Sequence, residues 1–291
     1  MYQDQPQDLV QNLFEEVMWP DHPLGRDIAG TLRSVQNLTR DDILEYANAR
    51  YRLPYLVAGA AGQIDETRLL ESVTERLTLP ADLDGEVPAL TPSSLSSPAL
   101  LLRRRRTEQA HVCLGVRALS YHDPDRYTFD LLNTILGEGM SSRLFLNIRE
   151  RLGLAYDVHS FTQKHQDTGY LGVYLGVDPG HTLKAVEAAI AELSALREQD
   201  VADDELERAK EFTKGRLRLE LETTNGVAFW LTYQQLVLGE LQTIEQELAI
   251  VDAISAADVR RVAGLVLSNP IQMAVVGPFS KEADFRALIG A

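Results

Sequence analysis

Leu38-Thr39-Arg40-Asp41-Asp42-Ile43 and Ile254-Ser255-Ala256-Ala257-Asp258-Val259 are the two stretches that decide how this chain is organised. In each, a hydroxyl side chain follows an apolar residue and an aspartate comes three positions later, which is the pattern of a capped helix start. A run typical of a buried strand that ends in glycine follows each stretch, at residues 54–59 and 270–277. Asp42 and Asp258 are 216 positions apart, and Leu24-Gly25 and Leu238-Gly239 are 214 positions apart. The repeated order at a steady offset indicates an internal duplication.

The duplication predicts an incomplete first copy. If residue 1 corresponds to about residue 217, the first copy lacks the counterpart of about residues 98–216, which hold the opening strands and first helices. We therefore expect an α+β fold of two homologous units, each a sheet covered by helices, with the first truncated at its amino terminus.

A linker separates the two predicted units. Residues 80–98 contain four prolines and four serines and no basic or aromatic residue, so they can bury little apolar surface. We predict a truncated amino-terminal unit at 1–85, a linker at 86–98 and a complete carboxy-terminal unit at 99–291.

The complete unit follows an order of strands and helices that the hydrophobic spacing predicts. Strand-like alternation covers 109–117, and residues 155–162 and 169–177 are expected to form an antiparallel pair. Helical spacing is expected at 126–136, 143–151, about 203–222, 226–238, 242–252 and 256–267, and a last strand at 271–277.

Composition and charge exclude some partners. The chain has 291 residues, 45% hydrophobic and 24% charged, which is enough apolar material for two cores. Its net charge of −15 repels nucleic acid and anionic membrane surfaces, so we predict neither as a partner. A basic protein or peptide fits this charge better.

The single cysteine and the first residues indicate a compartment. Cys113 has no second cysteine to pair with, which favours a reducing environment. The stretch from Met1 to Pro6 lacks the basic and apolar regions of a signal peptide, and no apolar run approaches membrane-spanning length. We expect a cytoplasmic protein.

The strongest candidate for chemistry is the run from Gly137 to Tyr156. Arg149 falls at the end of the predicted short helix and Tyr156 at the start of a strand, with Gly153 in the turn between them. An arginine and a tyrosine that converge there could hold a peptide carbonyl or stabilise an oxyanion. On these residues alone, an ion-paired arginine and a packing tyrosine are the commoner explanation.

Two other interpretations of the same turn are weaker. Gly137-Glu138-Gly139 could cradle a phosphate, but it lacks the full dinucleotide pattern and a Walker lysine. Ser141 and Ser142 do not lie in a nucleophile elbow, and helix capping explains them better.

The run 137–156 resembles the carboxy-terminal-domain signature of the pitrilysin and insulinase metallopeptidases, the inverted zincins, in the branch of the bacterial processing proteases and the mitochondrial processing peptidase. Matching stretches occur at 4–10, 22–26, 28–31, 207–210 and 273–277. The resemblance implies two α+β domains around an extended peptide or protein substrate. It implies zinc in the amino-terminal domain and, in the other, a catalytic arginine and tyrosine. These correspond to Arg149 and Tyr156, and we assign Gly137 and Gly139 to substrate binding beside them.

The sequence departs from that family at the zinc motif. The pattern H-x-x-E-H places two histidines four positions apart on a helix. None of the six histidines of this chain are so spaced: His22, His111, His122, His159, His165 and His181. The family's third ligand, a glutamate, would fall just before Met1.

We therefore assign no metal ligand and no cofactor to this chain, and we expect zinc only in the complete family enzyme. The expected function is the substrate-binding portion of a zinc-dependent endopeptidase, inactive alone, in a homo- or hetero-oligomer with a zinc-bearing segment or subunit. The alternative is a non-catalytic subunit or scaffold that uses the peptidase fold for protein interaction.

Overall fold

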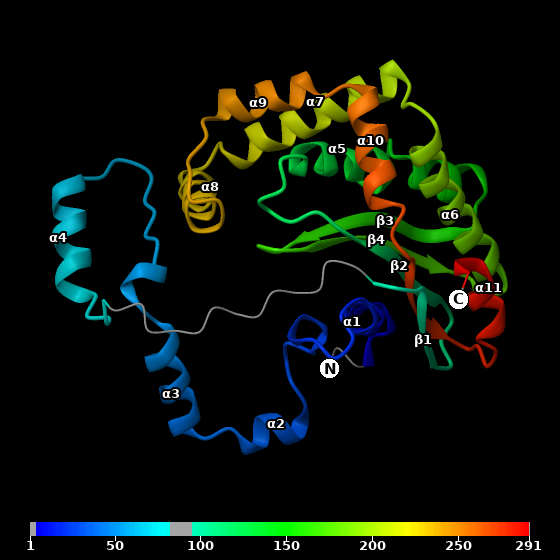
Figure 1. The fold of residues 1–291 in the computed structure, drawn as a ribbon, viewed down its shortest axis with the longest axis horizontal. Helices are drawn as coiled ribbons and strands as arrows, with labels where there is room; N and C mark the ends of the chain where they lie inside the picture. The colour runs from blue at the N-terminus through cyan, green and yellow to red at the C-terminus, as the bar shows by residue number, and fades with distance from the viewer. Residues whose placement is uncertain (1–3, 82–94, 291) are drawn as a thin grey trace. The chain divides into compact units, whose positions relative to one another are not determined.

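The computed structural model describes residues 4–81 and 95–290, and it divides into two compact units. Unit 1 comprises residues 1–28, 91–213 and 248–291, and unit 2 comprises residues 29–90 and 214–247. Figure 1 labels the elements of both.

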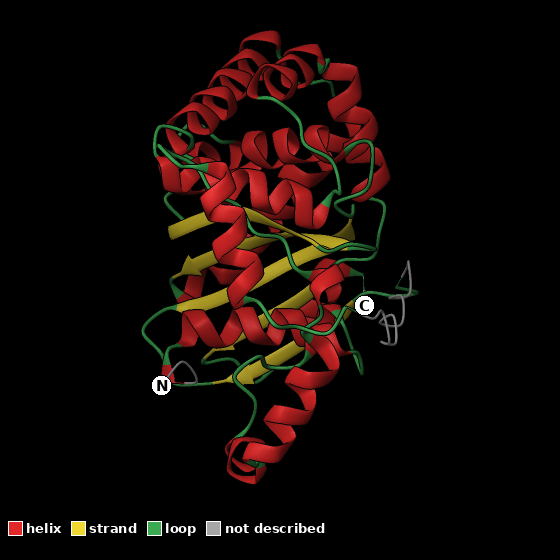
Figure 2. Ribbon diagram, turned by 90° about the vertical axis from the view of Figure 1, so that its left-hand side faces the viewer, coloured by secondary structure: helices red, strands yellow, loops and turns green. Residues whose placement is uncertain are grey.

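Unit 1 is built on a five-stranded sheet in the order β1-β5-β2-β4-β3 (Figure 2). The strands are β1 (Ala99–Arg104), β2 (Ala110–Ala118), β3 (Ala155–Lys164), β4 (Gly169–Val177) and β5 (Gln272–Gly277). Although β5 is last in sequence, it lies inside the sheet, parallel to β1 and antiparallel to β2. All of its residues are buried, as expected for a central strand.

Helices cover one face of this sheet. They are α5 (Arg126–Gly137), α6 (Thr182–Glu198), the first part of α7 (Asp203–Glu220), α10 (Ala256–Val266) and α11 (Ala283–Ile289). Because side chains alternate along a strand, Val112, Leu114 and Val116 of β2 all face these helices, and they are at most 1% exposed. Unit 1 also contains two short 3₁₀ turns, η2 (Pro23–Gly25) and η5 (Pro179–His181), and the short π-helix η4 (Phe145–Arg151).

The helix α1 (Pro6–Met18) covers the opposite face. Its buried residues Val10 and Phe14 pack in one cluster with Cys113 of β2, Tyr174 of β4 and Val276 of β5. The segment at the start of the sequence is therefore part of the core of the second repeat's sheet.

The contacts thus divide the chain differently from the sequence repeats. Residues 4–28 belong to the compact unit that holds the sheet, and the boundary within α7 falls at residues 213 and 214. The expected bounds 1–85, 86–98 and 99–291 stay a prediction about the repeats. Residues 86–94 of the expected linker lie outside the described residues.

Unit 2 contains α2 (Leu32–Asn37), α3 (Arg40–Arg50), the turn η3 (Leu53–Tyr55), α4 (Glu66–Arg76) and α8 (Thr224–Val237). The helix α9 (Ile244–Ala253) begins in unit 2 and ends in unit 1. None of the residues of α2, α3 and α4 is buried.

The buried strand that the sequence predicts at 54–59 is absent from this structure, so that prediction is wrong here. Residues 53–55 form a 3₁₀ turn, and none of the five strands in the described part of the chain pairs with residues 54–59. A lone extended segment gains no ladder of hydrogen bonds, which explains the difference.

Candidate functional site

Arg149 lies on a short helix of unusual geometry. Residues Phe145–Arg151 form a π-helix, η4, and such turns occur often at functional sites. The Arg149 guanidinium lies 5.1 Å from the centroid of the Phe145 ring, and the side chain is exposed. The predicted helix at 143–151 is confirmed in position, but its hydrogen-bond pattern could not be predicted from spacing.

A glycine ends this helix and turns the chain toward β3. Gly153 has φ +61°, a left-handed conformation that favours glycine. The Leu152 and Leu154 amides donate to the carbonyls of Asn147 and Ile148, at 3.0 and 2.9 Å. The turn that the sequence predicts between Arg149 and the strand is therefore present.

Tyr156 occupies a bulge in β3. Ala155 lies opposite Val177 and Asp157 lies opposite Gly176, so Tyr156 is the extra residue between two pairs. Its side chain is 60% exposed. Bulges re-aim a side chain and are common beside active sites.

Arg149 and Tyr156 come from consecutive elements, η4 and β3, of unit 1. Both side chains are exposed, and no hydrogen bond joins them in the part of the chain that the structure describes. That they act together on one ligand stays a prediction.

Ion pairs and hydrogen bonds fix the helix that carries Arg149. Arg143 donates two hydrogen bonds to Glu205 of α7, at 2.7 and 2.8 Å, and both side chains are 18% exposed. The Glu205 carboxylate raises the pKa of Arg143 above its usual value. Asn147 donates to Glu192 of α6 and accepts from Arg151. Glu205 and Glu192 are too far in sequence from Arg143 and Asn147 for these two contacts to be found by spacing.

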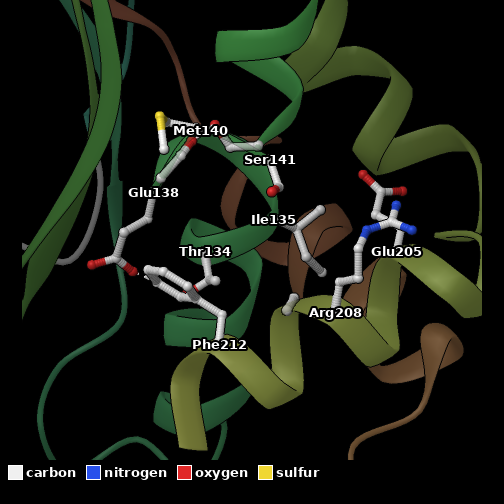
Figure 3. A pocket seen from close by; sticks show the side chains of 11 residues that line it. Thr134, Ile135, Glu138, Met140, Ser141, Glu205, Arg208 and Phe212 are labelled. Carbon is white, nitrogen blue, oxygen red and sulfur yellow. Dashed lines mark hydrogen bonds between the residues drawn. The ribbon is translucent and has the colours of Figure 1, made fainter. Parts of the chain in front are cut away.

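Beside the glycine turn lies a pocket of about 220 Å³ (Figure 3). Ile135, Met140, Ala209 and Phe212 contribute apolar surface to it. Figure 3 shows Glu138 and Phe212 at one end of the pocket and Arg208 and Glu205 at the other. The Glu138 carboxylate accepts a hydrogen bond of 2.9 Å from Thr134. The pocket can bind an apolar side chain beside the carboxylate of Glu138.

The two candidate glycines have different environments. Gly139 is exposed, lines the pocket and has φ +90°. Gly137 is buried at the end of α5, where an added Cβ would lie 2.3 Å from the Ser160 amide nitrogen of β3. Gly137 therefore allows a close helix–strand approach, and its assignment to substrate binding stays a prediction.

The described residues do not fit a zinc ion. No three of their His, Cys, Asp or Glu side chains form a group that could hold a metal. His111 Nδ1 lies 2.7 Å from the Tyr174 hydroxyl, and His159 Nδ1 lies 3.5 Å from Asp157. Burial lowers the pKa of His111. That the chain binds no zinc remains a prediction to be tested in solution.

Comparison with known proteins identifies the family. Residues 37–212 match the family model described as the peptidase M16 inactive domain. The chain belongs to the M16 peptidase family. The resemblance to the pitrilysin and insulinase type is thereby confirmed, and the chain contains a peptidase-fold domain of the kind described as inactive.

Relatives and solved structures agree with this assignment. An uncharacterized zinc protease of Streptomyces coelicolor is 35% identical over 98% of this chain and 64% of its own length. An uncharacterized zinc protease of Bacillus subtilis is 31% identical over 96% of this chain and 67% of its own. The crystal structure of a peptidase M16 inactive domain from Pseudomonas fluorescens has a TM-score of 0.81 at 18% identity, over 96% of this chain and 67% of that one.

The M16 chain described here thus spans 64% of the length of its Streptomyces relative. The predicted α+β class is confirmed by the sheet, its helical cover and the structural match. Within the described residues, no helix is long and apolar enough to cross a membrane.

Proposed function

We propose that this chain is the substrate-binding portion of a zinc-dependent endopeptidase of the processing-protease type. Zinc would be bound by a polypeptide segment other than residues 1–291. The observation that carries the proposal is the placement of Tyr156 in a bulge at an edge strand, directly after the helix that presents Arg149.

The edge strand β3 supports binding of an extended peptide. Among the described strands, β3 has one neighbour, β4, so its outer edge presents backbone groups to which another strand can add. A peptide along that edge would pass Tyr156. There the tyrosine hydroxyl and the Arg149 guanidinium would donate hydrogen bonds to a peptide carbonyl, in its ground state or as negative charge develops.

The pocket and the charge of the chain support a preference for basic peptides with apolar residues. The carboxylate of Glu138 borders the apolar surface of Met140 and Phe212. The net charge of −15 attracts cationic segments at low ionic strength.

The proposal is tested by peptide binding to the chain alone, which requires no metal. A fluorescent, extended, basic peptide should bind without being cleaved. Arg149→Ala should weaken the affinity about tenfold or more, because a charge-assisted hydrogen bond contributes about 1.5–3 kcal/mol. Arg104→Ala, at the exposed end of β1, is the matched control. If Arg149→Ala and Tyr156→Phe both bind like the unaltered chain, the site assignment is wrong.

The second candidate, a non-catalytic subunit or scaffold, is favoured by exposed apolar side chains of unit 2, such as Ile43 (59% exposed) and Tyr46 (63% exposed) of α3. Such a protein would bind partners through unit 2 and be indifferent to Arg149→Ala. The peptide-binding measurement therefore distinguishes the two.

A cytoplasmic location is part of the proposal. It is supported by the presence of a single cysteine, Cys113, because the 291 residues then form no disulfide of the kind that is common in oxidising compartments. Fractionation of the producing cells tests it.

A further inference from the structure

A second pocket lies in unit 1, at the edge of the sheet away from Tyr156. It has a volume of about 460 Å³, and its walls come from the end of α1 and the turn after it, from the start of β1 and the residues before it, and from β5. Strand β1 is at one edge of the sheet, whereas β3, which carries Tyr156, is at the other. This pocket is therefore separate from the candidate site at 137–156.

Gln272 supplies the pocket with a buried polar side chain. It is the first residue of β5, is fully buried and lines the pocket. Its Nε2 atom donates to the carbonyls of Ser97 and Pro270, at 3.1 and 3.2 Å. Its Oε1 atom is buried and has no hydrogen-bond partner among the described residues. Because a buried acceptor without a donor costs free energy, a ligand with a donor group would be stabilised here.

The two carbonyls also fix which way the Gln272 amide faces. If the amide were turned over, Oε1 would lie against the carbonyl oxygens of Ser97 and Pro270, and neither can donate a hydrogen bond. The unsatisfied atom is therefore an acceptor, and its missing partner is a donor.

Two carboxylates give the pocket a negative charge. Glu16 of α1 and Asp21 in the following turn both line it, and both residues are exposed. No lysine or arginine is among the lining residues, and neither carboxylate forms an ion pair within the described part of the chain. The charge of Glu16 and Asp21 is thus available to a cation from solution.

These groups together fit an alkylammonium ion. An ammonium has three N–H donors and no acceptor, so it can pair with carboxylates and also donate to Gln272 Oε1. Val17, Leu100 and Leu101 add apolar wall against which a hydrocarbon stem can pack. An anion would be repelled by the carboxylates, and an apolar molecule would leave Oε1 without a donor.

We propose that this pocket binds a primary alkylammonium group, with Glu16 and Asp21 as its ion-pair partners and Gln272 Oε1 as a hydrogen-bond acceptor. Two sources share this chemistry, the lysine side chain of a protein and a free linear diamine. The proposal goes beyond the proposed function and does not depend on it, because no residue of the run 137–156 takes part.

Nuclear magnetic resonance of the isotope-labelled whole chain tests the proposal, since it shows where a probe binds as well as how tightly. The probes are 1,5-diaminopentane and Nα-acetyl-lysine methylamide. Binding should shift backbone amides within residues 16–21 and 96–101 and the side-chain amide of Gln272. A response to the lysine derivative alone identifies a protein side chain as the ligand, and a response to the diamine alone identifies a free amine. The uncharged 1-pentanol should bind at least about tenfold more weakly, because it forms no charge-assisted hydrogen bond.

Glu16→Gln combined with Asp21→Asn is the decisive variant, because it removes both charges and keeps the shapes of the side chains. Both positions are exposed, so the fold should be unchanged. Asp21 has φ +57°, a left-handed conformation that asparagine also accepts. The affinity for the amines should fall at least about tenfold. Glu108→Gln, at an exposed position between β1 and β2 that does not line the pocket, is the matched control and should bind as the unaltered chain does.

The proposal is overturned if the amines shift no residue of this pocket, or if their shifts centre on residues 134–142 instead. It is also overturned if 1-pentanol binds as tightly as the amines, or if the double variant binds them with unaltered affinity. None of these outcomes involves Arg149 or Tyr156, so failure here is distinguishable from failure of the proposed function.

Discussion

The guanidinium of Arg117 lies 4.0 Å from the centroid of the Trp19 ring, and its Nε and Nη2 atoms donate to the Met18 carbonyl at 3.3 and 2.9 Å. Arg117 belongs to β2, whereas Met18 and Trp19 are at the end of α1. A cation placed at the carboxyl end of a helix also interacts favourably with the helix dipole. Buried Arg117 therefore binds the end of α1 to strand β2 of the sheet.

Arg117→Ala is expected to lower the free energy of unfolding by about 2–4 kcal/mol, since it removes a charge-assisted hydrogen bond and a desolvated cation–π contact. Urea denaturation followed by tryptophan fluorescence measures the change. Arg104→Ala, at an exposed position, should change it by less than about 0.5 kcal/mol. Equal effects of the two substitutions would contradict the role given to Arg117.

Gly137→Ala should destabilise unit 1 by several kcal/mol or displace the start of the glycine turn, because the new methyl group would overlap the backbone of Ser160. Gly264→Ala is the matched control. Gly264 lies within α10, where an added Cβ would meet no described atom within 4 Å other than its chain neighbours and the adjacent helix backbone, so alanine there should stabilise by about 0.5–1 kcal/mol. Thermal unfolding of both variants should show shifts of opposite sign.

Histidine 111 should make stability depend on pH. Burial lowers its pKa in the folded state, so the unfolded chain binds the proton more readily. The contribution of neutral, buried His111 to the free energy of unfolding is complete above pH 6.5, which is the pKa of this histidine in the unfolded chain. That contribution is lost as the pH falls below this value. His111→Asn should therefore lose less stability than the unaltered chain between pH 7.5 and pH 5, as measured by urea denaturation.

Arg149→Ala and Tyr156→Phe should leave the fold nearly unchanged, because both side chains are exposed. In an assembly restored with a zinc-bearing segment, loss of an oxyanion donor should lower turnover by on the order of 10² to 10³. A change confined to KM would indicate that the group only holds the substrate. If turnover and KM both stay unaltered, or if either variant unfolds, packing is the role of these residues.

The purified chain should bind no stoichiometric zinc and cleave no peptide, because its sequence lacks the H-x-x-E-H ligands and the glutamate between them. Elemental analysis and a peptidase assay with and without chelator measure this. About one zinc per chain, together with chelator-sensitive cleavage, would be the contrary result.

Local features of the fold could be predicted from the sequence. Thr39 with Asp42 and Ser255 with Asp258 form the two capping boxes that the spacing indicates. The strand expected at 169–177 matches β4. These features depend on residues within a few positions of one another, so their physics is visible in the sequence itself.

Features that depend on distant partners could not be predicted. The bulge at Tyr156 shows only in the register of β3 with β4, and the bridge from Arg143 to Glu205 joins residues 62 positions apart. The packing of α1 on β5 likewise cannot be read from the sequence of either segment alone. The wrong prediction of a strand at 54–59 has the same cause, because a strand is stable only when neighbouring strands accept and donate its backbone hydrogen bonds.

The internal position of β5 also constrains how the chain acquires its structure during synthesis. The strand β1 pairs only with β5 among the described strands, and α1 packs mainly on β5, yet β5 spans residues 272–277. At about 5–20 residues per second, a ribosome would need on the order of 10–50 s between making α1 and making its partner. During that interval the apolar side of α1 is open to water or to a chaperone, and contacts of such long sequence separation form slowly. The sheet of unit 1 is therefore completed only after residues 272–277 have been synthesised.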